Sequence, residues 1–398
     1  MDAIYDTPAR VVHRTRRGRR PLVWLAAIAA VYGSLCMQML AAATAPGFAA
    51  RPLSSAADVD PVPFYGERYA SSAGTPSVHA ATAIDVPGGM RAFWYGGTRE
   101  GAQDVAIYTA TYDHRAGAWA GEQRVVTRQS TEQGVRRYIR KLGNPVVARD
   151  RQGLLWLFYV SVSVGGWSGS AVNAQVSTDD GESWGAPRRL IASPFFNIST
   201  LVKGRPFLYE DGTIGVPAYH EFAGKFGEIL RVDAEGRVIG KTRLSHGRYS
   251  LQPVVVTRSP QEAIAFMRHG GHGPGNVLML RTRDGGETWS EPSRLALPNP
   301  NAAVDAMAMA DGSLALVFNN RHGGRDDLSL AVSHDAGDTW RIVHSFEKVQ
   351  AHAGRPPEFS YPWLAPARDG SRFHLLYTWR RQHIKHIKFD EDWLDERK

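Results

Sequence analysis

A guanidinium at the end of an apolar segment is the first feature of this sequence that suggests chemistry. Arg268 closes a strand-like apolar segment and precedes a glycine-rich stretch. A charge in that position is costly unless it meets an anion, and an arginine binds a carboxylate through two parallel hydrogen bonds. Arg325 is a second candidate, although Asp326 and Asp327 follow it and could pair with it. The two arginines predict a site for a negatively charged group.

Two carboxylates are candidates for acid or base chemistry. Asp104 lies in a loop, where a dry pocket would raise its pKa and let it donate a proton; it could equally cap the backbone N–H groups of a turn. Glu221 follows a strand-like segment and is the best candidate for a second carboxylate. Arg99 could bind substrate or form a salt bridge with the adjacent Glu100.

Further polar and aromatic residues lie in segments that we expect to point at one face of the fold. We expect ligand contacts from Asn144, Trp167, Arg205 and Asp305. Trp167 follows two glycines and offers a flat apolar face on which a sugar ring can stack. No spacing of histidines and carboxylates suggests a metal site, and no cofactor is expected.

Three copies of a short pattern indicate the elements that must position these residues. Segments 177–184, 282–289 and 333–340 all read Ser or Thr, any residue, Asp, any residue, Gly, any residue, Ser or Thr, and Trp. The Asp can accept backbone N–H bonds, the Gly takes a left-handed conformation, and the Trp opens the next strand with a large apolar face. Three copies, each before a strand-like segment, predict a repeated β-unit.

This pattern is the Asp-box of the sialidase (neuraminidase)-like, BNR-repeat proteins, and residues 64–390 resemble that superfamily. The resemblance implies an all-β fold, a six-bladed β-propeller whose blades are four-stranded antiparallel sheets. It also implies that the boxes lie on outer turns away from the active site. They therefore predict the fold strongly and catalysis weakly.

The spacing of the turns agrees with one blade per unit. Degenerate boxes at 112–119 and 232–236 fill the gaps, so that the units end near residues 119, 184, 240, 289 and 340. We expect the sixth blade to pair strands in 372–389 with a strand near the start of the domain, which protects the edges of the sheet.

Sialidases bind the substrate carboxylate with three arginines and use an Asp acid/base and a Tyr nucleophile activated by a Glu, an exception among glycosidases. The resemblance places Arg268 and Arg325 at the second and third arginines. His79 stands where the first arginine is expected, and Gln252 stands at the position of the Glu. Gln252 cannot act as a base.

The assignments of the acid and of the nucleophile depend on how this sequence is aligned with the sialidase pattern. Asp104 follows His79 at an interval that resembles the one between the first sialidase arginine and the acid. The nucleophile position falls on Phe359, which has no hydroxyl group. Tyr361 is two residues further on, on the same face of a strand, and could serve instead.

The N-terminal segment predicts a location outside the cytoplasm. Residues 1–20 hold six arginines and two aspartates, half of the net charge of +8, and form a basic cytoplasmic tail. Residues 21–45 form either a transmembrane anchor or a cleaved signal, with small residues for cleavage at 47–50. Residues 46–63 are a linker and 64–390 the propeller. The domain is then periplasmic, on the cell surface or secreted, which argues against a nucleic-acid partner.

Composition excludes a disulfide framework, because Cys36 is the single cysteine. We expect a monomeric, sialidase-like exo-glycosidase that acts on an acidic glycan terminus, with Asp104 as acid and Glu221 or Tyr361 as partner. Two alternatives stay open. One is a glycan-binding propeller without activity. The other is a uronic-acid polysaccharide lyase, in which His79 and Tyr361 would serve as base and acid.

Overall fold

A computed structural model describes residues 20–40, 46–49, 63–193, 197–246, 249–349, 354, 356–367 and 372–397. The chain divides into two units, Met1–Ala42 and Ala43–Lys398. The first contains α1 (Arg20–Leu40). Among the residues that the structure describes, no helix combines the length and the hydropathy that a membrane span needs. The expected basic tail before residue 20 and most of the expected linker, residues 50–62, lie outside the described ranges.

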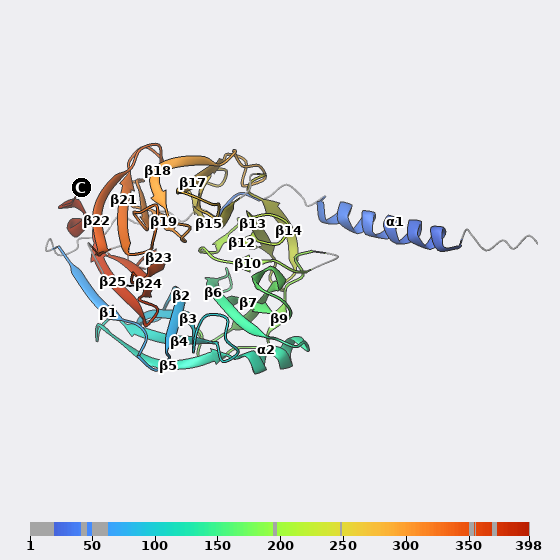
Figure 1. Ribbon diagram of the computed structural model, residues 1–398, viewed down its shortest axis with the longest axis horizontal. Coiled ribbons are helices and arrows are strands. Elements are labelled where there is room, and N and C mark those ends of the chain that lie inside the picture. Colours follow the sequence, from blue (N-terminus) through green and yellow to red (C-terminus); the bar gives the residue numbers. More distant parts are fainter. Residues whose placement is uncertain are drawn as a thin grey trace, which may run out of the picture. The chain divides into compact units, whose positions relative to one another are not determined.

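The second unit is a ring of six antiparallel sheets, or blades, around a central axis (Figure 1). Blade I contains β2 (Ser77–Val86), β3 (Gly89–Gly97), β4 (Ala106–Asp113) and β5 (Ala118–Val126). Blade II contains β6 (Lys141–Arg149), β7 (Leu155–Val162), β8 (Ser170–Ser177) and β9 (Arg188–Arg189). Blade III contains β10 (Leu201–Val202), β11 (Phe207–Leu208), β12 (Ile214–His220), β13 (Phe226–Val232) and β14 (Val238–Arg243).

The other three blades complete the ring. Blade IV contains β15 (Ser250–Thr257), β16 (Ala263–His269), β17 (Gly275–Thr282) and β18 (Ser293–Asn299). Blade V contains β19 (Asp305–Ala308), β20 (Leu314–Phe318), β21 (Asp327–Ser333) and β22 (Arg341–Lys348). Blade VI contains β23 (Phe359–Pro366), β24 (Arg372–Trp379), β25 (His383–Asp390) and β1 (Tyr65–Tyr69). Among the described residues of this unit, three short helices lie outside the blades: α2 (Arg128–Val135), η1 (Trp167–Gly169) and α3 (Glu391–Asp395).

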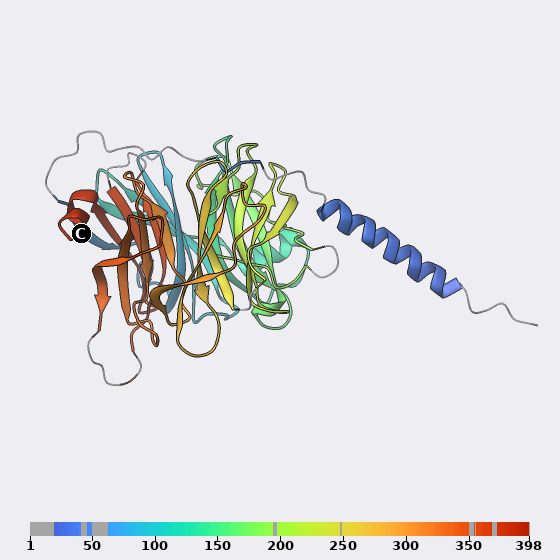
Figure 2. The ribbon, with the colours of Figure 1, turned by 90° about the horizontal axis from the view of Figure 1, so that it is seen from above.

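The prediction of a six-bladed propeller is confirmed, and so is its closure; five blades have the expected four strands, and blade III has five because its inner strand is divided into β10 and β11. β1, from the start of the domain, pairs with β25 from its end over five residues, from Tyr65 opposite Phe389 to Tyr69 opposite Lys385. Figure 2 shows the blades from the side, with the long strands of each sheet lying next to one another. Closure covers the side of β25 that would otherwise be an exposed sheet edge and makes β1 the outer strand of blade VI.

The three Asp-boxes occupy equivalent turns between the third and fourth strands of blades II, IV and V. In the first box, Asp179 accepts a hydrogen bond of 2.9 Å from the backbone of Ser183, and Trp184 Nε1 donates to Gly181 O at 3.1 Å. The other two boxes repeat both bonds. The Trp184 ring meets Phe93 of blade I edge-on, with the ring centroids 5.7 Å apart. Each box therefore closes a turn, and the first also joins two blades.

The inner strands carry the features that shape the centre of the ring. β2, β6, β15 and β23 each contain a break in register near their first residues. In three of them a residue other than glycine takes a left-handed conformation: Ala80 (φ 57°), Gln252 (φ 53°) and Tyr361 (φ 57°). In blade III, Gly204 (φ 96°) separates β10 from β11, and a Cβ there would lie 2.1 Å from Pro253 O. Such bulges turn side chains away from the regular alternation.

A short segment expected to be linker is part of the propeller. Phe48 is fully buried and bridges to Tyr209, and its ring packs against Phe207 and Tyr209 with centroids 5.4 and 5.6 Å away. At the other end of the unit, Trp393 and Leu394 of α3 are buried in the core, so that packed structure continues beyond residue 390. Cleavage at 47–50 would therefore remove a core residue or leave it at a new chain end.

Candidate active site at the centre of the ring

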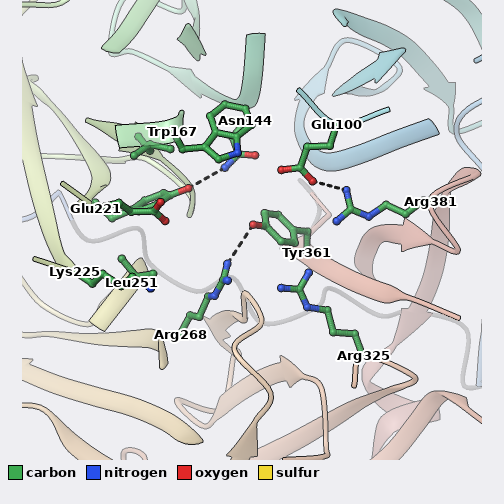
Figure 3. A pocket seen from close by; sticks show the side chains of 12 residues that line it. Glu100, Asn144, Trp167, Glu221, Lys225, Leu251, Arg268, Arg325, Tyr361 and Arg381 are labelled. Carbon is green, nitrogen blue, oxygen red and sulfur yellow. Dashed lines mark hydrogen bonds and ion pairs between the residues drawn. The ribbon is translucent and has the colours of Figure 1, made fainter. Parts of the chain in front are cut away.

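A cavity of about 290 Å³ opens at the end of the ring where the inner strands begin. Six of the residues predicted from the sequence line it: Asn144, Trp167, Glu221, Arg268, Arg325 and Tyr361. Among the others that line it are Glu100, Tyr219, Lys225 and Arg381. Figure 3 shows the guanidinium groups around Tyr361, with Glu221 on the opposite side of the cavity from Arg381.

Tyr361 lies at the centre of the cavity because of the bulge in β23. Its Oη accepts hydrogen bonds from Gln252 Nε2 at 2.9 Å and from Arg268 Nη1 at 3.3 Å. Phe359, by contrast, is buried in the core of blades V and VI. The expectation that positions 359 and 361 share one face is therefore wrong, because the left-handed backbone at Tyr361 breaks the alternation. Tyr361 is the hydroxyl that this strand presents to the cavity.

Arg268 is held by neutral groups. Its Nε donates to Asn301 Oδ1 at 2.6 Å, and its Nη1 donates to Gln252 Oε1 at 3.0 Å as well as to Tyr361. Within the described residues, no carboxylate pairs with it and its Nη2 donates to no group. The guanidinium is thus fixed in orientation while its charge is not neutralised by a neighbour. That arrangement suits the binding of an anion.

Arg325 and Arg381 belong to a chain of ion pairs. Glu358 accepts from Arg325 Nη1 at 2.9 Å and from Arg381 Nε at 2.8 Å, and Arg381 Nη1 continues to Glu100 Oε2 at 2.8 Å. Burial alone would raise the pKa of Glu358, but the surrounding positive charge holds it well below its usual range. Because burial holds the pKa of His79 well below its ordinary value, Arg381 and Arg325 supply that charge. Asp326 and Asp327 do not pair with Arg325.

Tyr219 and Asn144 line the cavity on the side of blades II and III. Tyr219 Oη accepts from Asn144 Nδ2 at 3.3 Å and from Gln252 Nε2 at 3.2 Å. Burial raises the pKa of Tyr219 well above its ordinary value, which keeps the phenol neutral. Gln252 thereby joins Tyr219, Tyr361 and Arg268 in one network. Its amide can orient these groups, but it cannot accept a proton from them.

Glu221 stands apart from this network. It lies on the loop after β12, where its backbone N–H donates to Ser199 Oγ at 2.8 Å. Its carboxylate forms no ion pair within the described residues, although it lines the cavity. Lys225, on the same loop, donates from Nζ to Gly270 O at 3.1 Å. Glu221 is therefore the cavity carboxylate without a fixed cationic partner, unlike Glu100.

His79 lies behind Tyr361 rather than in the cavity. It is fully buried, its Nδ1 is 2.8 Å from Thr378 Oγ1, and its ring centroid is 4.1 Å from that of Tyr361. Burial holds the pKa of His79 well below its ordinary value, with Arg381 adding to the shift. A neutral, enclosed imidazole positions Tyr361 but does not reach a ligand.

Asp104 and Arg99 are both exposed and do not line the cavity. Asp104 accepts from the backbone N–H of Thr98 at 2.8 Å and from its hydroxyl at 2.5 Å, which lowers the pKa of this carboxyl. The predicted raised pKa is therefore wrong, and the turn-capping alternative describes the residue. Glu100 pairs with Arg381 instead of Arg99.

Arg205 and Asp305 also lie outside the cavity lining. Asp305 is completely buried and accepts backbone N–H bonds from Ala306 and Leu364. Arg205 Nη2 is 4.0 Å from Asp305, and its guanidinium lies over the Trp363 ring. Nearby, burial lowers the pKa of Lys203 to about 8. These residues tie blades III, V and VI together across the axis.

Trp167 lines the cavity, but part of its surface is already covered. Lys141 Nζ lies 3.7 Å from the centroid of its ring, and its edge packs over Gly143, where a Cβ would lie 2.7 Å from Cη2. The predicted stacking platform is thus limited to the remaining surface of the ring. Among the described residues, no group of three or more His, Cys, Asp or Glu side chains is placed to hold a metal ion.

Sequence reasoning missed Arg381, Glu358 and Tyr219. Arg381 lies in the tight turn between β24 and β25 with φ 62°, and Glu358 directly precedes the predicted Tyr strand. The only hint in the sequence was that Arg380, Arg381 and Glu358 lie near the ends of blade VI strands. Their meeting with Glu100 depends on ring closure, which brings residues 281 positions apart into contact.

Comparison with known proteins agrees with this geometry. The family described as BNR repeat-like domain matches residues 88–375, which is more than half of the chain. The chain belongs to this family. A curated sialidase from Bacteroides fragilis (strain YCH46) is 27% identical over 193 residues, which covers 42% of this chain. The match spans 33% of that relative's own length.

Solved structures show the same fold as this BNR-family chain. The Hadza microbial sialidase Hz136 has a TM-score of 0.65 at 18% identity and covers 81% of this chain and 68% of its own. The NanB sialidase from Streptococcus pneumoniae has a TM-score of 0.63 at 11% identity and covers 81% of this chain and 70% of its own. The sialidase-like propeller is therefore the architecture that positions the cavity.

Proposed function

We propose that this propeller is a sialidase-like exo-glycosidase that binds the acidic terminal sugar of a glycan in the central cavity. The observation that carries the proposal is Arg268. Its guanidinium faces a cavity of about 290 Å³, is oriented by Asn301, Gln252 and Tyr361, and has no carboxylate partner within the described residues. A sugar carboxylate is the ligand group that complements such a charge.

Arg325 and Arg381 complete a set of three cavity arginines. Sialidases bind their carboxylate with three arginines, and this chain has His79 where the first of them is expected. Arg381 comes from blade VI but lies beside Glu100 of blade I, so that it supplies a guanidinium on that side of Tyr361 (Figure 3). Glu358 fixes the orientation of Arg325 and Arg381 and neutralises part of their charge.

In the reaction that we propose, Tyr361 Oη attacks the anomeric carbon while Glu221 donates a proton to the departing glycosidic oxygen. Water then attacks the anomeric carbon and the sugar–tyrosine bond breaks; Glu221 takes the proton of this water, and the Tyr361 oxygen regains a proton from solvent. Glu221 suits this role better than Glu100, because Glu100 is paired with Arg381. Gln252 and Arg268 hold the Tyr361 hydroxyl but accept no proton from it, so the phenol proton leaves to solvent.

One observation favours a second function, that of a glycan-binding propeller without activity. Both side chains that donate to Tyr361 Oη, Gln252 and Arg268, lack a group that can act as a base. A lyase that uses His79 as its base is disfavoured, because this side chain is fully buried and lies behind Tyr361.

The test is a panel of acidic and neutral glycans, with release of the terminal sugar and binding measured separately. We expect release from acidic glycans by the wild type, a loss of about 10²–10⁴ in turnover for Glu221→Gln, and no turnover for Tyr361→Phe with binding retained. Binding without release by the wild type supports the binding propeller. An unsaturated product that absorbs in the ultraviolet supports a lyase and contradicts our proposal.

The location of the propeller outside the cytoplasm is part of the same proposal. It rests on the arginine-rich start of the chain and the apolar residues that follow it. Because Phe48 is a core residue, we propose that any processing occurs before Gly47. An alkaline phosphatase fused to the C-terminus should be active in a bacterial host, and N-terminal sequencing should find no start after residue 47. A silent phosphatase fusion would reject export.

A further inference from the structure

A cluster of cations lies in blade II, between the end of α2 and the start of β6 and on the neighbouring strand β9. The basic rim consists of five residues: Arg136, Arg137, Arg140, Lys141 and Arg189. The first four lie between the end of α2 and the start of β6, and Arg189 lies in β9, the outer strand of the same blade. Arg136, Arg137 and Arg140 are exposed, and the other two are partly buried.

The charges of the basic rim lack ion-pair partners among the described residues. None of its five residues forms an ion pair within the part of the chain that the structure describes. Burial lowers the pKa of Arg189, and the neighbouring charge of Arg137 lowers it further. Burial also lowers the pKa of Lys141, where Glu100 opposes the shift and Arg140 adds to it. Arg137 and Arg189 therefore repel each other, and so do Arg140 and Lys141.

The dipole of α2 explains the position of only some of these cations. Arg136 is the C-cap of α2, and Arg136 and Arg137 lie at the negative end of its dipole. The α2 helix has eight residues and cannot account for Arg140, Lys141 or Arg189, which lie beyond it. Like charges kept together without a carboxylate partner lower stability, so a bound anion is the physical reason that fits them.

Two residues of the basic rim, Lys141 and Arg140, adjoin the loop that lines the cavity. Lys141 Nζ lies 3.7 Å from the centroid of the Trp167 ring, and Trp167 lines the cavity. Arg140 Nη1 donates to Gly165 O, on the same loop as Trp167, at 3.3 Å. Two exposed apolar side chains lie among these residues, Tyr138 at 58% and Val164 at 77% exposure. Cations beside exposed apolar surface suit sugar rings that carry acidic groups.

We propose that the basic rim binds the body of a linear polyanionic glycan whose acidic end occupies the cavity. This inference rests on the proposed function and names its substrate class: chains with acidic groups on successive sugars, rather than a single acidic sugar on a neutral glycan. Arg137, Arg140 and Arg189 contact acidic groups of the sugars that follow the terminal one. Trp167 and Lys141 mark the boundary between the cavity and the rim.

The test compares an acidic monosaccharide with its chain. The rim variant is Arg136→Gln/Arg137→Gln/Arg140→Gln in the full chain. The control variant is Arg115→Gln/Arg258→Gln/Arg283→Gln, which removes the same charge from exposed arginines near the turns at the opposite end of the blades. The probes are monomers and hexamers of sialic acid and of galacturonate, and a neutral dextran. Dissociation constants are measured at two salt concentrations, with melting temperatures as a check of folding.

For at least one of the two acids, sialic acid or galacturonate, we expect the wild type to bind the hexamer more tightly than the monomer. The rim variant should lose about tenfold in affinity for that hexamer, with a weaker salt dependence and no change for the monomer. The control variant should stay within twofold of wild type. Equal losses in the two variants would show an effect of net charge alone and overturn the proposal. So would hexamers that bind no better than monomers, or an equal loss of affinity for the neutral dextran.

Arg268→Ala separates this inference from the proposed function. If the cavity binds the terminal acid, the substitution weakens monomer and hexamer alike. If it changes neither while the rim variant still loses hexamer affinity, the proposed function of the cavity fails and the rim remains a polyanion site.

Discussion

Replacing Phe48 by Ala should destabilise the propeller strongly, although this residue precedes the first strand. Phe48 is fully buried, its ring packs against Phe207 and Tyr209, and its backbone N–H donates to Pro260 O at 2.7 Å. The segment also receives a bond of 2.7 Å from Glu210 N to Gly47 O. It therefore joins blade III to the edge of blade IV.

The expected loss of stability follows from the complete burial of the Phe48 side chain. Removing a fully buried Phe side chain costs about 3–5 kcal/mol. The entropy of unfolding for a unit of roughly 350 residues is about 0.7 kcal/mol per kelvin near 60 °C, so that the melting temperature should fall by about 4–7 °C. Scanning calorimetry of the full chain measures this shift. The matched control is Phe222→Ala, because Phe222 is 66% exposed and its loss should change the melting temperature by less than one degree.

Two outcomes would refute the reasoning. One is a Phe48→Ala protein with an unchanged melting temperature. The other is equal destabilisation by Phe48→Ala and Phe222→Ala, which would mean that burial does not set the cost. A chain that starts at residue 51 should be at least as unstable as Phe48→Ala, since it loses the backbone bonds as well.

Two other predictions concern the charges of the site. Glu358→Gln should lower the melting temperature at neutral pH, because the ion pairs of Arg325 and Arg381 lose their carboxylate. The folded pKa of Glu358 is lowered, so its contribution is present above about pH 4.3 and is lost as the pH falls below it. Melting curves of both proteins should therefore converge in acid; a gap that widens there contradicts the assignment. Asp104→Asn should keep turnover within about threefold of wild type, since Asp104 caps a turn through Thr98; a loss of 10² or more would restore it as the acid.

The fold was predictable because its evidence is local. Each Asp-box carries its own hydrogen bonds and its own Trp, so that the three copies at 177–184, 282–289 and 333–340 predict equivalent turns without any knowledge of distant contacts. Ring closure followed from the need to pair the last strands with the first.

The site was only partly predictable because its contacts are distant in sequence. Arg268 was found from its place at the end of an apolar strand. Tyr361 was assigned through a strand alternation that its own bulge breaks. Arg381 meets Glu100 across 281 positions, and no local pattern marks that contact. For Asp104 the sequence pattern was misleading. Its spacing from His79 resembles the spacing of the sialidase acid, but the residue caps a turn through Thr98.

The most direct test of the central claim is the affinity of Arg268→Ala for an acidic sugar and for its neutral analogue, measured by titration calorimetry. Arg268 faces the cavity with neutral partners, so we predict a loss of about 1.5–3 kcal/mol for the acidic sugar, or about 10–150-fold, and a small change for the neutral one. Arg99→Ala, which removes an exposed arginine outside the cavity, should bind both like wild type. Equal losses for the acidic and neutral sugars in Arg268→Ala would contradict carboxylate recognition and, with it, the proposed function.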